Sequence, residues 1–139
     1  MALITLTPAD MRLGTGTTCS QGIAGETITP FQWLYLKAGD GKYWKAINTT
    51  AAEATIVGVA LTYAAGDQEV AFAVINPGTS YLTSASANWV KGLNYVVGSV
   101  AGQLSLPGDL TAGMFHTIGG VAASTTSLLL YNTNSGLIA

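Results

Sequence analysis

The sequence predicts an all-β protein: a small β-barrel or sandwich built from two similar β units, with an extended N-terminal arm. Three observations favour this class. First, 17 glycines interrupt the 139-residue chain, so few segments are long enough for a helix. Second, the segments between them are rich in β-branched and aromatic residues. Third, the predicted strands recur at a spacing of about 8–12 residues, which is typical of sandwiches and small barrels.

The first predicted strands form a hairpin. Aromatic-rich runs at residues 31–37 and 42–47 flank the pair Asp40-Gly41. Asp-Gly between two such runs is a strong hairpin signal, because both residues tolerate the positive φ that tight turns require. We therefore expect two antiparallel strands here.

Two more strands are predicted in the first half of the chain. Residues 54–62 form an apolar run in which Gly58 indicates a bulge or a close approach of another backbone. A turn at 65–67 leads to a second run at 69–75, which ends at Asn76-Pro77-Gly78. That trio combines a fixed φ with a residue that accepts positive φ, so it predicts a turn.

The second half of the chain repeats this organisation. Residues 79–91 fit either a short helical turn or an extended loop, and we leave both interpretations open. Beyond them, short runs bounded by Gly, Pro or Asn predict strands at 94–97, 103–106, 114–118 and 127–132.

The two halves are also similar in sequence. Residues 55–62 match residues 117–124 at five of eight positions, at an offset of 62. Gly41 then lies against Gly102, and Tyr35 against Tyr95. This predicts an internal repeat over about residues 34–74 and 94–132 within one β domain, 27–139. The alternative is coincidence between segments rich in Gly, Ala and Val.

Residues 1–26 form the predicted arm. A Gly- and Thr-rich stretch at 14–22 follows an apolar start. We expect this arm to gain order by packing on a neighbouring subunit or partner, with an ordinary edge strand of the same domain as the alternative. The apolar side chains that would make such contacts are Leu3, Ile4, Leu6, Met11 and Leu13.

Charged side chains are scarce. Five Lys and Arg and seven Asp and Glu make up 9% of the chain, whereas a typical soluble domain has about 25%. Such a surface requires either many neutral polar groups, which Thr, Ser and Asn supply, or partners that cover it. We therefore expect the isolated chain to be an oligomer.

The composition argues against several classes of protein. A net charge of −2 with scattered Lys and Arg provides no basic face for nucleic acid. We expect no membrane partner, because no apolar run is long enough to span a bilayer, and no signal peptide. The single cysteine, Cys19, allows no disulfide within the chain and fits folding in a reducing cytoplasm.

Residues suited to catalysis are few, and we predict no enzyme, no cofactor and no metal site. His116 is the only histidine, and the sequence has no G-x-S-x-G elbow. Cys19 has no basic neighbour to activate its thiol. Asp67 and Glu69 flank the start of a strand, where we expect solvated charges. The HExxH, CxxC and Asp-rich patterns of metal sites are absent from the sequence.

Aromatic side chains gather at two places. We expect Trp33 and Tyr35 in the core, whereas Trp44, beside them, and Trp89 remain candidates for a sugar-stacking or protein-binding surface. Trp89 joins the apolar residues of the arm as a predicted interface residue.

Four segments, at 24–46, 54–74, 90–105 and 116–132, resemble the turn-and-strand motifs of the capsid decoration (cement) proteins of tailed bacteriophages. The resemblance implies small β-barrel subunits, commonly homotrimers, on the outer surface of an icosahedral capsid. There they stabilise contacts between major capsid proteins. It also implies a structural virion protein that is made in the host cytoplasm and has no catalytic residues.

The expected function is therefore capsid stabilisation, with the major capsid protein and further copies of the chain as partners. Two alternatives remain. A carbohydrate-binding or fibre/tail β-module of a phage particle would use exposed tryptophans. A hydrolase would need His116 and a nearby nucleophile in one cleft.

Overall fold

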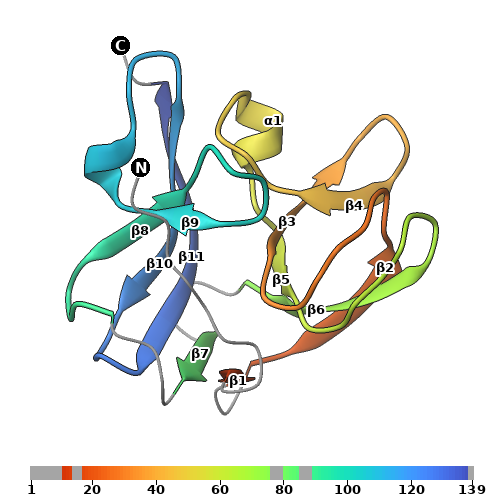
Figure 1. Cartoon of the computed structure of the whole chain (residues 1–139), viewed down its shortest axis with the longest axis horizontal. Coiled ribbons are helices and arrows are strands. Elements are labelled where there is room, and N and C mark those ends of the chain that lie inside the picture. Colours follow the sequence, from red (N-terminus) through yellow and green to blue (C-terminus); the bar gives the residue numbers. More distant parts are fainter. Residues whose placement is uncertain (1–10, 14–16, 76–79, 85–88, 138–139) are drawn as a thin grey trace.

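A computed structural model of the chain describes residues 11–13, 17–75, 80–84 and 89–137. The predicted all-β class is confirmed, because the described strands form two antiparallel sheets. Sheet A has the strand order β1-β7-β11-β10-β8-β9, and sheet B has the order β2-β6-β5-β3-β4. Among the described residues, helix is limited to α1 (Ala51–Ala54) and the 3-10 turn η2 (Pro107–Asp109). Figure 1 shows the two sheets side by side.

Eight of the strands overlap the predicted runs, with β5 shorter and β10 and β11 longer than expected. The other three are β1 and β2, in the predicted arm, and β7, in the segment 79–91. The bounds of the strands are β1 Met11–Leu13, β2 Cys19–Ile23, β3 Trp33–Lys37, β4 Lys42–Lys45, β5 Gly58–Ala60, β6 Glu69–Val74, β7 Tyr81–Ser84, β8 Asn94–Val97, β9 Leu104–Ser105, β10 Phe115–Ala122 and β11 Ser127–Leu137. Within the undecided segment 79–91, β7 is extended and pairs with β11.

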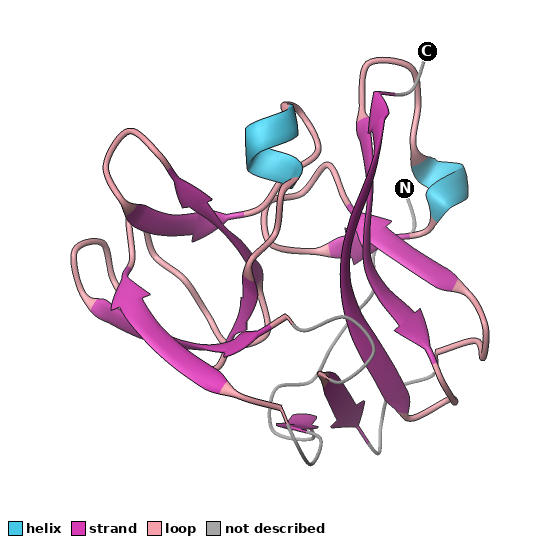
Figure 2. Cartoon of the chain, turned by 180° about the vertical axis from the view of Figure 1, so that it is seen from behind, coloured by secondary structure: helices cyan, strands magenta, loops and turns pink. Residues whose placement is uncertain are grey.

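Sheet B curls into a small barrel. Ala24, just after β2, bridges to Tyr43 of β4, and the Gly25 N–H donates to the Tyr43 carbonyl at 2.9 Å. The two outer strands of the sheet therefore meet at a seam, and the curl is plain in Figure 2. We call β2 to β6 the barrel. Its interior holds the buried side chains of Ala24, Ile28, Leu34, Ala60, Ala64, Val70 and Phe72.

Two glycines make this seam possible. A Cβ atom on Gly22 would lie 2.1 Å from Cε2 of the Tyr43 ring, and one on Gly25 would lie 2.2 Å from Cε2 of the Trp44 indole. Real Cβ atoms do not approach so closely, so only glycine lets β4 lay its aromatic rings across the end of β2.

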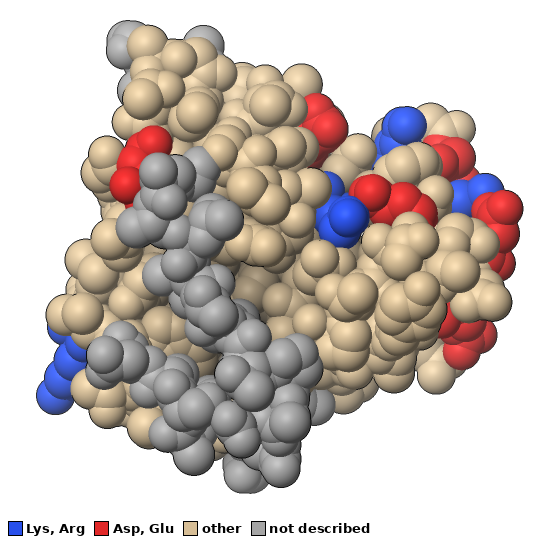
Figure 3. Space-filling view, viewed as in Figure 1, with Lys and Arg blue, Asp and Glu red and all other residues tan. Residues whose placement is uncertain are grey.

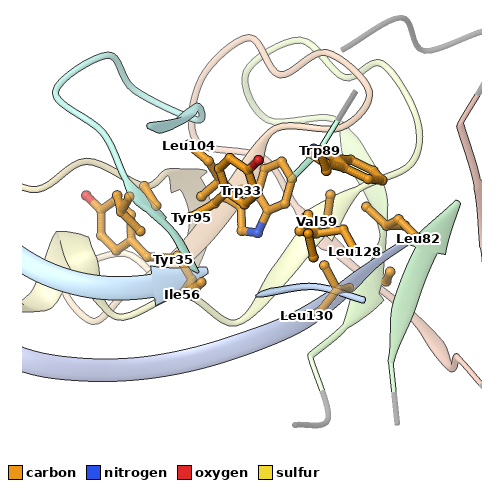
Figure 4. Close-up of a cluster of buried hydrophobic side chains, with 14 residues drawn as sticks. Trp33, Tyr35, Ile56, Val59, Leu82, Trp89, Tyr95, Leu104, Leu128 and Leu130 are labelled. Atoms are coloured by element: carbon orange, nitrogen blue, oxygen red, sulfur yellow. The ribbon is translucent and has the colours of Figure 1, made fainter. Parts of the chain in front are cut away.

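A second core joins the barrel to sheet A. Side chains alternate along β3, so that Leu34 points into the barrel while Trp33 and Tyr35 point toward sheet A. Trp33 is 1% exposed and donates from Nε1 to the Gly119 carbonyl of β10 at 3.3 Å. Figure 4 shows it at the centre of this core, between Leu104 and Val59. The prediction that Trp33 and Tyr35 belong to the core is confirmed.

The two halves of the chain share one topology. The order β6-β5-β3-β4 in sheet B has its counterpart in β11-β10-β8-β9 of sheet A, and each half carries a short helical turn after its hairpin. Gly41 and Gly102 both have positive φ, 68° and 83°. With these turns aligned, the pair Tyr35–Trp44 corresponds to the pair Val96–Ser105. Tyr35 thus matches Val96 instead of Tyr95, because one offset of 61 fits the whole hairpin.

Part of the predicted arm belongs to the domain. β2 pairs with β6 over five residues, from Cys19–Ala73 to Ile23–Glu69, and β1 pairs with β7. The arm boundary at residue 26 is therefore wrong. Residues 19–23 form a strand of the domain, because β6 offers their backbone groups hydrogen-bond partners, and Ala24 is buried in the core. Residues 1–10 and 14–16 lie outside the described part of the chain.

The predicted Asp40-Gly41 hairpin is present, and Asp40 organises its turn. Its Oδ1 accepts from the Lys42 N–H at 2.9 Å, and its Oδ2 accepts from Nε1 of Trp44 at 3.1 Å. These bonds favour the ionised carboxylate. The pKa of Asp40 is therefore lowered, mainly by the Lys42 N–H and further by the Trp44 indole and the nearby Lys37.

We expect Asp40→Ala to lower stability in a pH-dependent way. A carboxyl whose pKa is lower in the folded state stabilises the fold above its unfolded pKa of about 3.9, and that stabilisation is lost as pH falls through the folded pKa. The melting temperatures of wild type and variant should differ most above about pH 5, and the difference should shrink as pH falls below the unfolded pKa of about 3.9. A difference that does not change with pH would contradict this role for the charge.

Candidate functional site

The strongest candidate for a functional surface is the outer face of sheet A, which points away from the barrel. Leu128 and Leu130 of β11 face the core, so the alternating Leu129 and Tyr131 face outward. Register extends this face across four strands, because Leu129 pairs with Tyr81 and with Val121, and Val121 pairs with Asn94. By the same alternation, the outer face comprises Tyr81, Thr83, Asn94, Val96, Ile118, Val121, Ser127, Leu129 and Tyr131.

Across β7, β11, β10 and β8, the outer-face residues are apolar or neutral polar, whereas on the edge strand β1 the backbone of Arg12 pairs with the outer-face residue Thr83. Leu129, Val121 and Ile118 are half-buried in the single chain, whereas Val96 is fully buried. A sheet that buries one face normally shows polar side chains on the other. The run Leu128-Leu129-Leu130-Tyr131 instead places apolar groups on both faces, as strands covered from both sides do.

Charges are distributed very unevenly between the two halves of the chain. Residues 70–139 contain only Lys91 and Asp109, although they make up half of the protein. Figure 3 shows the acidic and basic side chains gathered over the barrel, with few on the side of sheet A. The barrel segment, residues 19–69, carries Glu26, Lys37, Asp40, Lys42, Lys45, Glu53, Asp67 and Glu69.

Several of the barrel charges pair with one another. Lys42 forms an ion pair with Asp67, which raises the pKa of Lys42. Glu26 accepts from the Lys45 N–H at 3.0 Å, and its other oxygen lies 3.7 Å from Lys45 Nζ. Glu26 follows β2 and Lys45 ends β4, so this contact stabilises the seam of the barrel. Asp67, predicted as a solvated charge, is thus a partner in an exposed ion pair.

The predicted interface residues fall into three groups: those outside the described part of the chain, those in β1, and Trp89. Leu3, Ile4 and Leu6 lie outside the described residues. Met11 and Leu13 lie in β1, whose backbone pairs with Ser84 and Leu82 of β7.

Trp89 is a correction. It is 3% exposed and belongs to the core between the barrel and sheet A, together with Leu82 and Leu128. An indole buried in this way has no surface to offer a partner. The large apolar area of tryptophan favours burial whenever a core can accept it.

The two tryptophans that a sugar-stacking module would use already make contacts within the protein. Trp89 is in the core, and Trp44 lies against Gly25, donates to Asp40 and has Lys37 Nζ 4.6 Å from its ring centroid. A more exposed aromatic side chain is Tyr63, at 62%. No pattern in the sequence distinguishes Tyr63 from the other aromatic residues.

The fold does not bring Cys19 to His116 as the nearby nucleophile that a hydrolase would need. Cys19 is exposed on β2 in sheet B, whereas His116 lies on β10 in sheet A. Nδ1 of His116 is buried and makes no hydrogen bond. Ser105, which sequence reasoning missed, is fully buried on the nearby β9, and its Oγ also lacks a partner. Neither atom is accessible to a substrate.

The described part of the chain has no metal-binding cluster of side chains and no membrane-spanning helix. Over these residues, His, Cys, Asp and Glu side chains form no group of three or more that could hold a metal ion. No helix in the same part of the chain is long and apolar enough to cross a membrane.

Comparison of the chain with protein-family models and with curated proteins found no match.

Proposed function

We propose that this protein is a structural virion component that binds the outer surface of an icosahedral phage capsid and stabilises contacts between major capsid proteins. The sequence motifs that resemble decoration proteins support this proposal. An all-β domain with two packed cores is a suitable body for it, because a clamp needs rigid geometry and no reactive groups.

The observation that carries the proposal is the outer face of sheet A, where β7, β8, β10 and β11 present apolar and neutral polar side chains. A protein that remained alone in solution would gain from charged side chains there, yet eight of the twelve charged residues lie in the barrel segment, residues 19–69. Apolar and hydroxyl groups without charge suit a partner surface that buries them permanently.

This distribution suggests how the molecule sits on the shell. The outer face of sheet A contacts the capsid proteins or a sibling subunit, and the charged barrel points to solvent. Contacts of this kind are individually modest, but many copies on a symmetric shell act together. Because few charges take part, binding should change little with salt.

We expect Leu129→Lys to reduce capsid binding at least tenfold, because a buried, unpaired ammonium must lose its hydration at the interface. The matched control is Thr62→Lys, which adds the same charge at an exposed site after β5. Cosedimentation with capsids that lack the protein measures both variants at low and high salt. Equal binding of wild type and Leu129→Lys would contradict a contact through this face.

Light scattering of the free protein distinguishes the two possible partners of this face, a sibling subunit and the capsid shell. If sibling subunits meet there, Leu129→Lys lowers the mass of the free oligomer together with capsid binding. If only the shell is contacted, the oligomer persists and only cosedimentation is lost. A stable 14.2 kDa species in the wild type would contradict the expected homo-oligomer.

A further inference from the structure

One face of the first half of the chain is buried against the second half. Trp33 of β3 pairs with Val59 of β5, and Val59 pairs with Ala73 of β6, so the three side chains form a row on the outside of the barrel. Each is at most 1% exposed and belongs to the core shared with the inner face of sheet A. Figure 4 shows Val59 in one cluster with Leu128 and Leu130 of that inner face. The row is therefore the surface through which the barrel packs on a β-sheet.

The outer face of sheet A carries the corresponding row in the second half. Strands β8, β10 and β11 take the places that β3, β5 and β6 have in sheet B. Asn94 pairs with Val121, and Val121 pairs with Leu129, so these residues stand where the buried row stands in the first half. Val121 and Leu129 are half-buried, and Asn94 is exposed. A surface that packs on a sheet in one half of the molecule thus remains partly open in the other.

The kind of partner that fits this face follows from its counterpart and from its charge. The counterpart row is covered by the face of a β-sheet, and sheets commonly pack face to face through apolar side chains. On β7, β8, β10 and β11, the outer face presents apolar and neutral polar side chains. A charged partner would lose hydration against these strands without gaining an opposite charge. The partner should therefore offer a neutral β-sheet face.

A second copy of the chain offers such a face. Its barrel segment, residues 19–69, carries eight of the twelve charged residues, and the inner face of its sheet A is covered by its own barrel. Its outer face of sheet A has the same neutral composition as the face that it would meet. Thr83 and Ser127 lie on this face, and a hydroxyl group both donates and accepts hydrogen bonds. The polar groups of the face can therefore pair with those of an identical face.

We propose that the outer face of sheet A packs on the same face of a second copy, so that two subunits meet about a two-fold axis. Contact between identical faces has this symmetry. Leu129 and Val121 form the central pair of the face, because β11 and β10 lie between β7 and β8. The axis therefore passes near Leu129, and the Leu129 side chains of the two subunits approach each other. The inference rests on the proposed function, because it assigns the contact face named there to a sibling subunit.

Two variants of opposite charge test this contact. Leu129→Lys and Leu129→Asp each place like charges on both sides of the axis, so each should weaken the dimer at least about tenfold. An equal mixture of the two variants brings a lysine opposite an aspartate, and the dimer should form again. Sedimentation velocity over a concentration series measures the mass of the wild type, of each variant and of the mixture. The controls are Thr62→Lys and Thr62→Asp, which add the same charges at an exposed site after β5 and should leave the dimer unchanged.

Several results would overturn the two-fold contact: a wild type that is monomeric or trimeric, variants that keep the mass of the wild type, or a mixture that forms no dimer. Far-UV circular dichroism shows whether each variant is folded, and Val121→Asp replaces Leu129→Asp if the latter is not. Cosedimentation with capsids separates this inference from the proposed function. A monomeric wild type that cosediments contradicts only the two-fold contact, whereas a dimer that does not cosediment contradicts only the capsid role.

Discussion

Trp33→Ala should lower the free energy of unfolding by about 3–5 kcal/mol, the usual cost of removing a large aromatic side chain from a core. Trp33 is 1% exposed and lies between the barrel and sheet A. The substitution leaves a cavity there and takes the Nε1 donor away from the Gly119 carbonyl. Urea unfolding followed by far-UV circular dichroism measures the loss.

The matched control is Leu36→Ala on the same strand. Leu36 is 47% exposed, so its truncation removes far less buried area. We expect a change below about 1 kcal/mol. If Trp33→Ala cost no more than Leu36→Ala, the indole would not be what joins the two halves of the molecule.

Gly58→Ala should destabilise the barrel by about 1–3 kcal/mol or more, because it forces an extra carbon into a closed site. A Cβ atom on Gly58 would lie 2.5 Å from Cδ2 of Phe72 and 2.8 Å from the carbonyl oxygen of Ala73. The Phe72 ring fills the barrel, and the Ala73 carbonyl belongs to the neighbouring strand. Relief of the clash therefore requires β5 and β6 to separate. Thermal unfolding measures the effect.

The repeat provides a comparison for this prediction. Gly120 corresponds to Gly58 in the second half, and the three atoms nearest to a Cβ atom there all belong to the Leu128 side chain, at 2.8–2.9 Å. Gly120→Ala should therefore cost less than Gly58→Ala. Gly39 has open space around it, so Gly39→Ala serves as the neutral control. Equal stabilities for Gly58→Ala and Gly39→Ala would contradict the close strand packing.

Trp33 and Gly58 both matter for the proposed function. A protein that holds a capsid shell under internal pressure must transmit force between its contact face and the rest of its body without deforming. Trp33 couples the barrel to sheet A, and Gly58 allows the close packing of β5 on β6 within the barrel. Variants at both positions should therefore lower the stability of the free protein, whereas Leu129→Lys acts on binding.

Several local features could be predicted from residues alone. The Asp40-Gly41 turn and the strand run at 69–75 are local signals, which neighbouring residues determine. The similarity of the two halves follows from comparing the sequence with itself. The helix α1 was missed, although its signal is present: Thr50 accepts from the Glu53 N–H, and Glu53 accepts from the Thr50 hydroxyl. The sequence prediction placed a strand over the apolar run 54–62, which begins at the last residue of this helix, and did not use the capping box before it.

Other features were decided only by the tertiary structure, because they depend on what each segment packs against. Pairing with β6 made residues 19–23 an edge strand of the barrel. The junction of the two cores buried Trp89. Strand pairing on the two edges of β8 buried Ser105 of β9 and Nδ1 of His116 of β10. By itself, the sequence determined strand content, turn positions and the scarcity of charge. Strand register and burial determined which uncharged residues form the core and which form the outer face of sheet A.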